Sequence, residues 1–129
     1  MLRSLALVAL LLAVGGCGRG DDRDTARDVT GRFFAAVEAG DGELACRQLN
    51  PETRSALEEQ GSSACRAAVT QLDLQGAPVE SVEVYEREAF VKLTSGEAAF
   101  LDQGSDGWRI SAAGCTPVGD KPYDCQLES

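Results

Sequence analysis

The sequence predicts an α+β protein in which helices precede a curved antiparallel sheet. Apolar residues recur every three to four positions as far as Leu72, and they alternate with polar residues from Ser81 to Ala112. Ahead of both regions lies a short apolar run, typical of a secretory signal. Its removal at residue 16 leaves 113 of the 129 residues, the length of one small domain. We expect residues 25–129 to form that domain.

The N-terminal segment has the three parts of a signal peptide. Arg3 supplies positive charge, Leu5 to Val14 is apolar, and Gly15-Gly16 supplies small residues. The apolar run has ten residues, whereas a membrane-spanning helix needs about 20. Residues 1–16 are therefore predicted to be a signal peptide.

Val14-Gly15-Gly16-Cys17 resembles the lipobox of bacterial lipoproteins. The resemblance implies cleavage before Cys17 and attachment of a diacylglyceryl group, with acyl chains such as palmitate, to the Cys17 sulfur. Two acyl chains hold a small protein on a bilayer, whereas one binds marginally. We expect a lipid-anchored protein on the extracytoplasmic face of the cell membrane. The alternative is an ordinary signal peptide with an incidental cysteine and a secreted product.

The mature chain is acidic. Without Arg3, eleven Lys and Arg residues face 21 Asp and Glu residues, which makes the formal charge −10. Such a surface repels nucleic-acid phosphates and anionic lipid headgroups. We expect no nucleic-acid partner, and membrane attachment is assigned to the lipid alone.

The four remaining cysteines are even in number, which fits disulfide formation outside the cytoplasm. Of the three possible pairings, spacing favours Cys46 with Cys65 and Cys115 with Cys125, because each pair lies in its own local segment. A four-thiolate zinc site is the alternative, but such sites usually contain cysteines only two to four residues apart. The sequence predicts two disulfides and no metal.

A tether and a long helix are expected after the anchor. Residues 17–24 are polar and contain glycine, which is typical of a flexible tether. Thr25 and Asp28 match a capping box, and apolar residues then recur at helical spacing until Gly40. We expect an amphipathic helix of about four turns that buries Phe33.

Three shorter helices follow in the prediction. The first begins at Asp41 and carries Cys46, and the second begins at Asn50-Pro51 as its cap and first-turn proline. The third begins near Ser62 or Ser63 and carries Cys65, Ala68, Val69 and Leu72. This placement puts the first cysteine pair on neighbouring helices.

The period of two defines four strands joined by tight turns. The turns are predicted at Glu86-Arg87, Ser95-Gly96 and residues 103–107. The apolar positions of the strands alternate with polar or outward positions, and they are Val82, Val84, Ala89, Val91, Leu93, Ala99, Leu101, Trp108, Ile110 and Ala112. These strands form an antiparallel meander with the helices on one face.

Thr116 to Asp124 is predicted to be a loop. Pro117 and Pro122 cannot donate to a sheet ladder, so we expect no fifth central strand here. A disulfide at its two ends folds this loop back over the sheet, where Tyr123 covers apolar surface. We expect it to be a structural clasp.

Two segments of the chain resemble the NTF2-like (cystatin-like α+β) superfamily. They are V-x-x-x-F-F-A-A-V-x-A-G-D-G-E-L-A-C, from Val29 to Cys46, and the later G-W-R-I. The endings A-A-G-C-x-P and P-Y-D-C are similar to those of small uncharacterised lipoproteins of high-GC Gram-positive bacteria. The resemblance spans most of residues 25–126 and implies a cone-shaped cavity in the sheet. Members of the superfamily range from enzymes to transport adaptors, so the fold carries no activity with it.

Candidate catalytic groups are few. The sequence has no histidine, and paired cysteines offer no thiol nucleophile. What remains is a carboxylate with a tyrosine, an arrangement that the resemblance links to isomerases and epoxide hydrolases. The candidates are Asp102 with Tyr85, and Tyr123 near the end. Both members of the first pair lie at or beside predicted turns, where polar residues are most often merely solvated.

Asp102 to Gly107 matches part of a calcium-loop pattern. Gly104 and Ala113 stand at the third and twelfth positions, which therefore lack their ligands. A glycine-rich turn explains the stretch, and we expect no metal and no cofactor.

These observations favour an anchored accessory or binding module of the cell envelope without catalytic activity. Its sheet cavity or acidic face is expected to meet an envelope protein or an extracellular ligand. Two alternatives stay open: a small enzyme that uses Asp and Tyr in a cone-shaped pocket, and a purely structural envelope lipoprotein. A carboxylate facing a tyrosine in the cavity would favour the enzyme.

Overall fold

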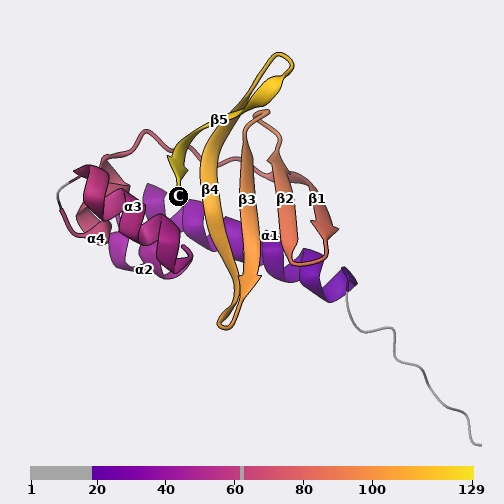
Figure 1. The fold of residues 1–129 in the computed structure, drawn as a ribbon, viewed down its shortest axis with the longest axis horizontal. Helices are drawn as coiled ribbons and strands as arrows, with labels where there is room; N and C mark the ends of the chain where they lie inside the picture. Colours follow the sequence, from indigo (N-terminus) through magenta and orange to yellow (C-terminus); the bar gives the residue numbers. More distant parts are fainter. Residues whose placement is uncertain (1–18, 62) are drawn as a thin grey trace, which may run out of the picture.

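The computed structural model describes residues 19–61 and 63–129, in which helices are followed by a five-stranded antiparallel sheet (Figure 1). The helices are α1 (Arg19–Glu38), α2 (Gly42–Arg47), α3 (Pro51–Gly61) and α4 (Cys65–Ala68), with the 3₁₀ helix η1 (Val69–Gln71) after them. The strands are β1 (Val79–Tyr85), β2 (Glu88–Leu93), β3 (Ala98–Gly104), β4 (Gly107–Val118) and β5 (Lys121–Glu128). The predicted α+β class is confirmed. The predicted signal peptide, residues 1–16, and the predicted lipidation residue Cys17 lie outside the described residues.

α1 begins six residues earlier than predicted, so the prediction of a flexible tether is wrong for residues 19–24. The Asp22 carboxylate accepts a hydrogen bond of 3.0 Å from the indole nitrogen of Trp108, which ties the start of α1 to β4. The Thr25 hydroxyl donates to the Asp21 carbonyl inside the helix, at 2.9 Å, rather than capping it. The partner of Asp22 is 86 residues away, so the polar composition of this segment could not indicate the contact.

α1 crosses one face of the sheet, which we call the inner face (Figure 1). Phe33 of α1 is fully buried, together with one large aliphatic side chain from each of four strands. These four side chains are Leu93, Leu101, Ile110 and Leu127. Large side chains therefore occupy the interior where the NTF2-like resemblance implies a cavity.

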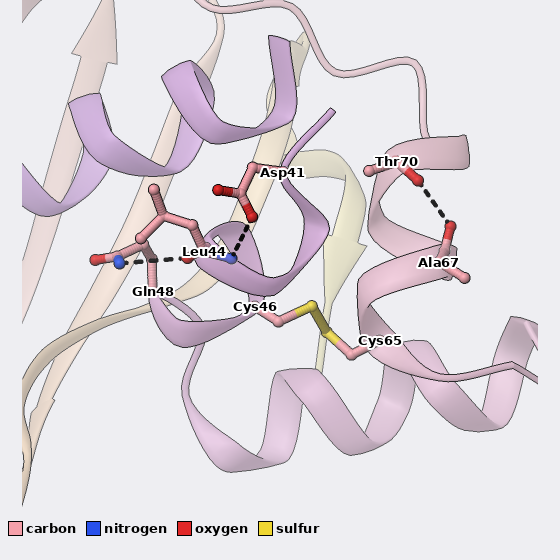
Figure 2. Close-up of a disulfide and its surroundings, with 7 residues drawn as sticks. All are labelled: Asp41, Leu44, Cys46, Gln48, Cys65, Ala67 and Thr70. Carbon is pink, nitrogen blue, oxygen red and sulfur yellow. Dashed lines mark hydrogen bonds between the residues drawn. A yellow bond between two sulfur atoms is a disulfide. The ribbon is translucent and has the colours of Figure 1, made fainter. Parts of the chain in front are cut away.

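The shorter helices gather beside β5 (Figure 1), and α2 and α3 begin at the predicted caps. The Asp41 carboxylate accepts a hydrogen bond of 3.0 Å from the Leu44 amide at the start of α2 (Figure 2). Asn50 accepts one of 2.8 Å from the Thr53 amide at the start of α3. Both caps satisfy amides that have no partner within the helix. α4 is shorter than predicted, because the chain tightens into η1 after four residues.

Both predicted disulfides are present in the structure. Cys46 of α2 bonds to Cys65 of α4, so the first bridge joins two helices that lie side by side (Figure 2). Cys115 of β4 bonds to Cys125 of β5, and these two residues are also directly paired in the sheet. Each bridge is local, as the spacing of the cysteines predicts.

The strands pair in the order β1-β2-β3-β4-β5, and the predicted meander is confirmed. One apolar position is corrected: Ala112 does not follow Ile110 onto the inner face. Phe100 pairs with Ala112 while its neighbour Leu101 pairs with Ile110, so Ser111 is an extra residue in β4. This β-bulge turns Ala112 away from the core and leaves Ala113 buried.

The helical end of the molecule holds the bulge in place. The Thr53 hydroxyl of α3 donates to the Ser111 carbonyl at 2.9 Å. The amide and carbonyl of Ile110 bond to the Gln48 carbonyl and the Asn50 amide, at 2.7 and 2.9 Å. A short parallel bridge thus continues the sheet beside the bulge. These contacts join segments that are distant in the sequence. The alternation of apolar and polar residues could therefore not indicate the bulge, and it predicted a regular strand.

The predicted loop from Thr116 to Asp124 is instead a hairpin that ends in a fifth strand. Thr116 pairs with Asp124 and Val118 with Lys121, so the pairing skips Pro117 and Pro122. β5 lies at the edge of the sheet, where a residue without an amide hydrogen is tolerated. Pro122 is on this edge strand, and Pro117 lies in β4 beyond Cys115, the last residue that pairs with β3, so neither proline interrupts pairing in the middle of the sheet.

The Asp22–Trp108 hydrogen bond leads to a stability prediction. Replacing Asp22 with alanine leaves the buried Trp108 indole without an acceptor, and we expect the free energy of unfolding to fall by about 1–2 kcal/mol. Chemical denaturation followed by tryptophan fluorescence measures this loss. Asp24→Ala is the matched control, because Asp24 is exposed on the same helix. Equal stability of the two variants would show that the contact does not hold α1.

Candidate functional site

The face of the sheet opposite α1, which we call the outer face, carries no described helix over β1, β2 or β3 (Figure 1). The strand register sorts its side chains into rows. One row crosses all five strands and consists of Glu83, Phe90, Phe100, Ala112 and Glu128. Paired residues of an antiparallel sheet point to the same side. The row therefore has two aromatic rings near its centre and a carboxylate at each end.

Three aromatic rings form a cluster on the outer face. The ring centroids of Phe90 and Phe100 are 5.1 Å apart, and the ring centroid of Tyr123 lies 5.6 Å from both. We call Phe90, Phe100 and Tyr123 the outer aromatic cluster. All three side chains are half-buried. A hollow of about 320 Å³ adjoins the cluster, and Ala112 and Glu128 also line it.

The outer face carries an excess of negative charge. Among the described side chains, one ion pair forms, between Lys92 and Glu80 at 3.2 Å. The Arg109 guanidinium donates to the Trp108 carbonyl at 2.8 Å. The carboxylates of the aromatic row and of the next row towards the β1–β2 turn are Glu83, Glu88, Asp102 and Glu128. Four carboxylates thus share these two rows with a single described cation, Arg109.

The predicted carboxylate and tyrosine lie in the same row but are not brought together. Tyr85 of β1 and Asp102 of β3 both pair with Glu88 of β2, which stands between them. Asp102 accepts a hydrogen bond of 2.8 Å from the Asn50 side chain. Tyr85 is 65% exposed and donates to Glu83 at 3.2 Å. Asp102 and Tyr85 therefore form hydrogen bonds with different residues, Asn50 and Glu83.

The surroundings of Tyr85 also bear on its chemistry. The hydrogen bond to Glu83, and then the negative charge of that carboxylate, raise the pKa of the Tyr85 phenol above its ordinary value of 10.0. Both effects favour the neutral phenol over the phenolate. A tyrosine of raised pKa is poorly matched to proton transfer near neutral pH.

The stretch from Asp102 to Gly107 forms the end of β3, a tight turn and the start of β4. Gly107 has a φ of +91°, which favours glycine at the end of the turn. Within the part of the chain that the structure describes, no three His, Cys, Asp or Glu side chains are grouped so that they could hold a metal ion.

The outer aromatic cluster is the feature that sequence reasoning missed. Phe90 and Phe100 were recognisable as outward positions of adjacent strands, and that was the available signal. Tyr123 was expected to cover apolar surface from a loop, but it does so from β5. The sequence did not show that the three rings meet, because the register of β5 was not predicted.

Comparison of the chain with protein-family models, curated proteins and solved structures finds no match. Over residues 19–61 and 63–129, no helix is both long enough and apolar enough to cross a membrane.

The second disulfide ties down the strand that carries Tyr123. Replacing Cys115 and Cys125 with serine removes a bridge across ten residues of sequence, and we expect the free energy of unfolding to fall by about 2–3 kcal/mol. The melting temperature should then drop by at least about 5 °C in thermal unfolding experiments. The parent chain with both bridges is the reference. Unchanged melting would mean that this bridge is not a structural element.

Proposed function

We propose that this chain is a lipid-anchored lipoprotein of the extracytoplasmic membrane face and acts as a non-catalytic binding module of the cell envelope. Its outer face contacts an envelope protein or an extracellular ligand. The observation that supports this function is the outer aromatic cluster on a sheet face that carries no described helix over β1, β2 or β3 (Figure 1).

Aromatic side chains on an open sheet face are suited to binding. A buried aromatic side chain removes about 150–250 Å² from water. At about 25 cal/mol per Å² of apolar surface, completing the burial of three half-buried rings contributes usefully to affinity. Contiguous apolar surface rimmed by polar groups is a common mark of interaction sites. Here Glu83 and Glu128 stand at the two ends of the row.

Asp102 and Tyr85, the candidate catalytic pair, have structural partners instead. Asp102 is held by Asn50, which also caps α3, and Tyr85 donates to Glu83. A reaction that uses a carboxylate with a tyrosine needs the two groups to meet at a substrate. This arrangement supports a binding module over the enzyme alternative.

The start of α1 limits how far the proposed anchor can hold the domain from a bilayer. Arg19 is two residues after Cys17, and two residues span at most about 7 Å. The first turn of α1 lies at the end of the molecule that carries the β1–β2 and β3–β4 turns, and the tip of the β4–β5 hairpin lies at the opposite end (Figure 1). A lipid on Cys17 would leave the outer face beside the membrane rather than against it.

The anchor is tested by replacing Cys17 with alanine. We expect the variant to leave the membrane fraction or to accumulate at its unprocessed size, because the sulfur is the proposed acyl acceptor. Cell fractionation with immunoblotting measures both outcomes. Gly18→Ala keeps the sulfur and is the control. A Cys17→Ala protein that stays in the membrane fraction at the processed size would overturn the lipoprotein proposal.

The binding surface is tested by photo-cross-linking in intact cells. A photoreactive amino acid at position 88, on the outer face, is expected to yield a discrete adduct in gel electrophoresis. The same amino acid at exposed position 59, on α3, is the control and is expected to yield none. An adduct at position 59 alone would assign the binding surface to the helices.

A further inference from the structure

We infer that the ligand of the outer face is a cationic peptide segment that lies extended across the strands. This inference rests on the proposed function, because it names the ligand class of the same surface. It draws on the charge of the outer face, on its aromatic rings and on the spacing of the two end carboxylates.

Charge favours a cation. Glu83 and Glu128 are exposed at the two ends of the aromatic row, and Glu88 is exposed in the next row. Asp102 receives its hydrogen bond from the neutral amide of Asn50, so that contact does not offset its negative charge. The one described lysine on this face, Lys92, is offset by Glu80. Complementary charge speeds association and selects among partners.

The aromatic rings favour the same class of ligand. A Lys or Arg side chain within about 6 Å of a ring centroid is attracted to the face of the ring. The aliphatic stems of these side chains also pack on apolar surface while the charge stays in water. Phe90, Phe100 and Tyr123 provide such a surface between the carboxylates. Cations of the ligand therefore find rings at the centre of the row and carboxylates at its ends.

The spacing of the end carboxylates sets the pattern of the ligand. Glu83 and Glu128 lie on the outermost strands of the five, so four spacings of about 4.8 Å separate them, about 19 Å in all. An extended peptide covers about 3.3 Å per residue. Two cations about six positions apart, with apolar side chains between them, match the row.

The test uses the full chain, purified in detergent with both disulfides formed. The probe is an acetylated heptapeptide amide, Lys-Ser-Leu-Ser-Leu-Ser-Lys, and its counterpart has Glu in place of both lysines. Titration calorimetry at low and high salt measures affinity, and amide chemical shifts of the labelled protein map the surface. We expect the lysine peptide to bind, to shift amides on all five strands, and to lose affinity as salt increases.

Two pairs of variants distinguish binding at the outer face from attraction to the negative charge of the whole protein. Glu83→Gln with Glu128→Gln should weaken binding of the lysine peptide about three- to tenfold. Glu43→Gln with Glu58→Gln makes the same change in net charge at the hollow between α2, α3 and α4, and it should leave affinity unchanged. Phe100→Leu keeps an apolar side chain but removes the ring, and it should also weaken binding. Circular dichroism checks that each variant is folded.

The inference would be overturned if the lysine peptide did not bind, or if the glutamate peptide bound equally well. Equal losses of affinity in the two glutamine pairs would also overturn it. A neutral glucan tetrasaccharide is titrated as a further probe, and tighter binding of this saccharide to the same amides would be a fourth contrary result. These failures are distinguishable from failure of the proposed function. If the cross-link at position 88 persists while the lysine peptide does not bind, the outer face is a binding surface for another class of ligand. If both are absent, the surface and the ligand class are both wrong.

Discussion

The structure depends on the packing of α1 across the inner face of the sheet. Phe33 is fully buried in the same core as Leu101 of β3 and Ile110 of β4. Each Å² of apolar surface that this packing removes from water stabilises the fold by about 25 cal/mol. This packing also decides which side chains of a strand face inward, because successive side chains alternate between the two faces of the sheet. Once Leu101 faces α1, its neighbour Phe100 must face away. The outer aromatic cluster is thus a direct consequence of the core.

The β-bulge at Ser111 connects the helical end of the molecule to the outer face. Thr53 of α3 bonds to the carbonyl of this residue, and the extra residue moves Ala112 into the row of Phe100. A small side chain at this position leaves room for the hollow that Phe100 and Glu128 also line. A contact from α3 therefore helps to shape a surface on the sheet.

Polar groups on the outer face divide into two kinds. Asn50 caps α3 and holds Asp102, so this pair links a helix to β3 and serves the fold. The glutamates at the ends of the aromatic row do not link a helix to the sheet in this way: Glu83 accepts a hydrogen bond from Tyr85 of its own strand, and Glu128 lines the hollow beside the outer aromatic cluster. This division shows how one sheet face can combine structural carboxylates with the surface for which we propose a ligand. It also explains why a carboxylate and a tyrosine on the same face need not form a catalytic pair.

The sequence by itself determined the features that depend on near neighbours. Helical and alternating periods, the caps at Asp41 and Asn50, and both disulfides follow from interactions within about 20 positions of the chain. Only the tertiary structure decided the start of α1, the bulge in β4, the edge strand β5 and the meeting of the three aromatic rings. Each of these depends on partners chosen by packing: Trp108 for Asp22, Thr53 for the Ser111 carbonyl, and Phe90 with Phe100 for Tyr123. A local pattern shows which side of a strand a residue occupies, but the residue it meets there depends on how distant segments pack.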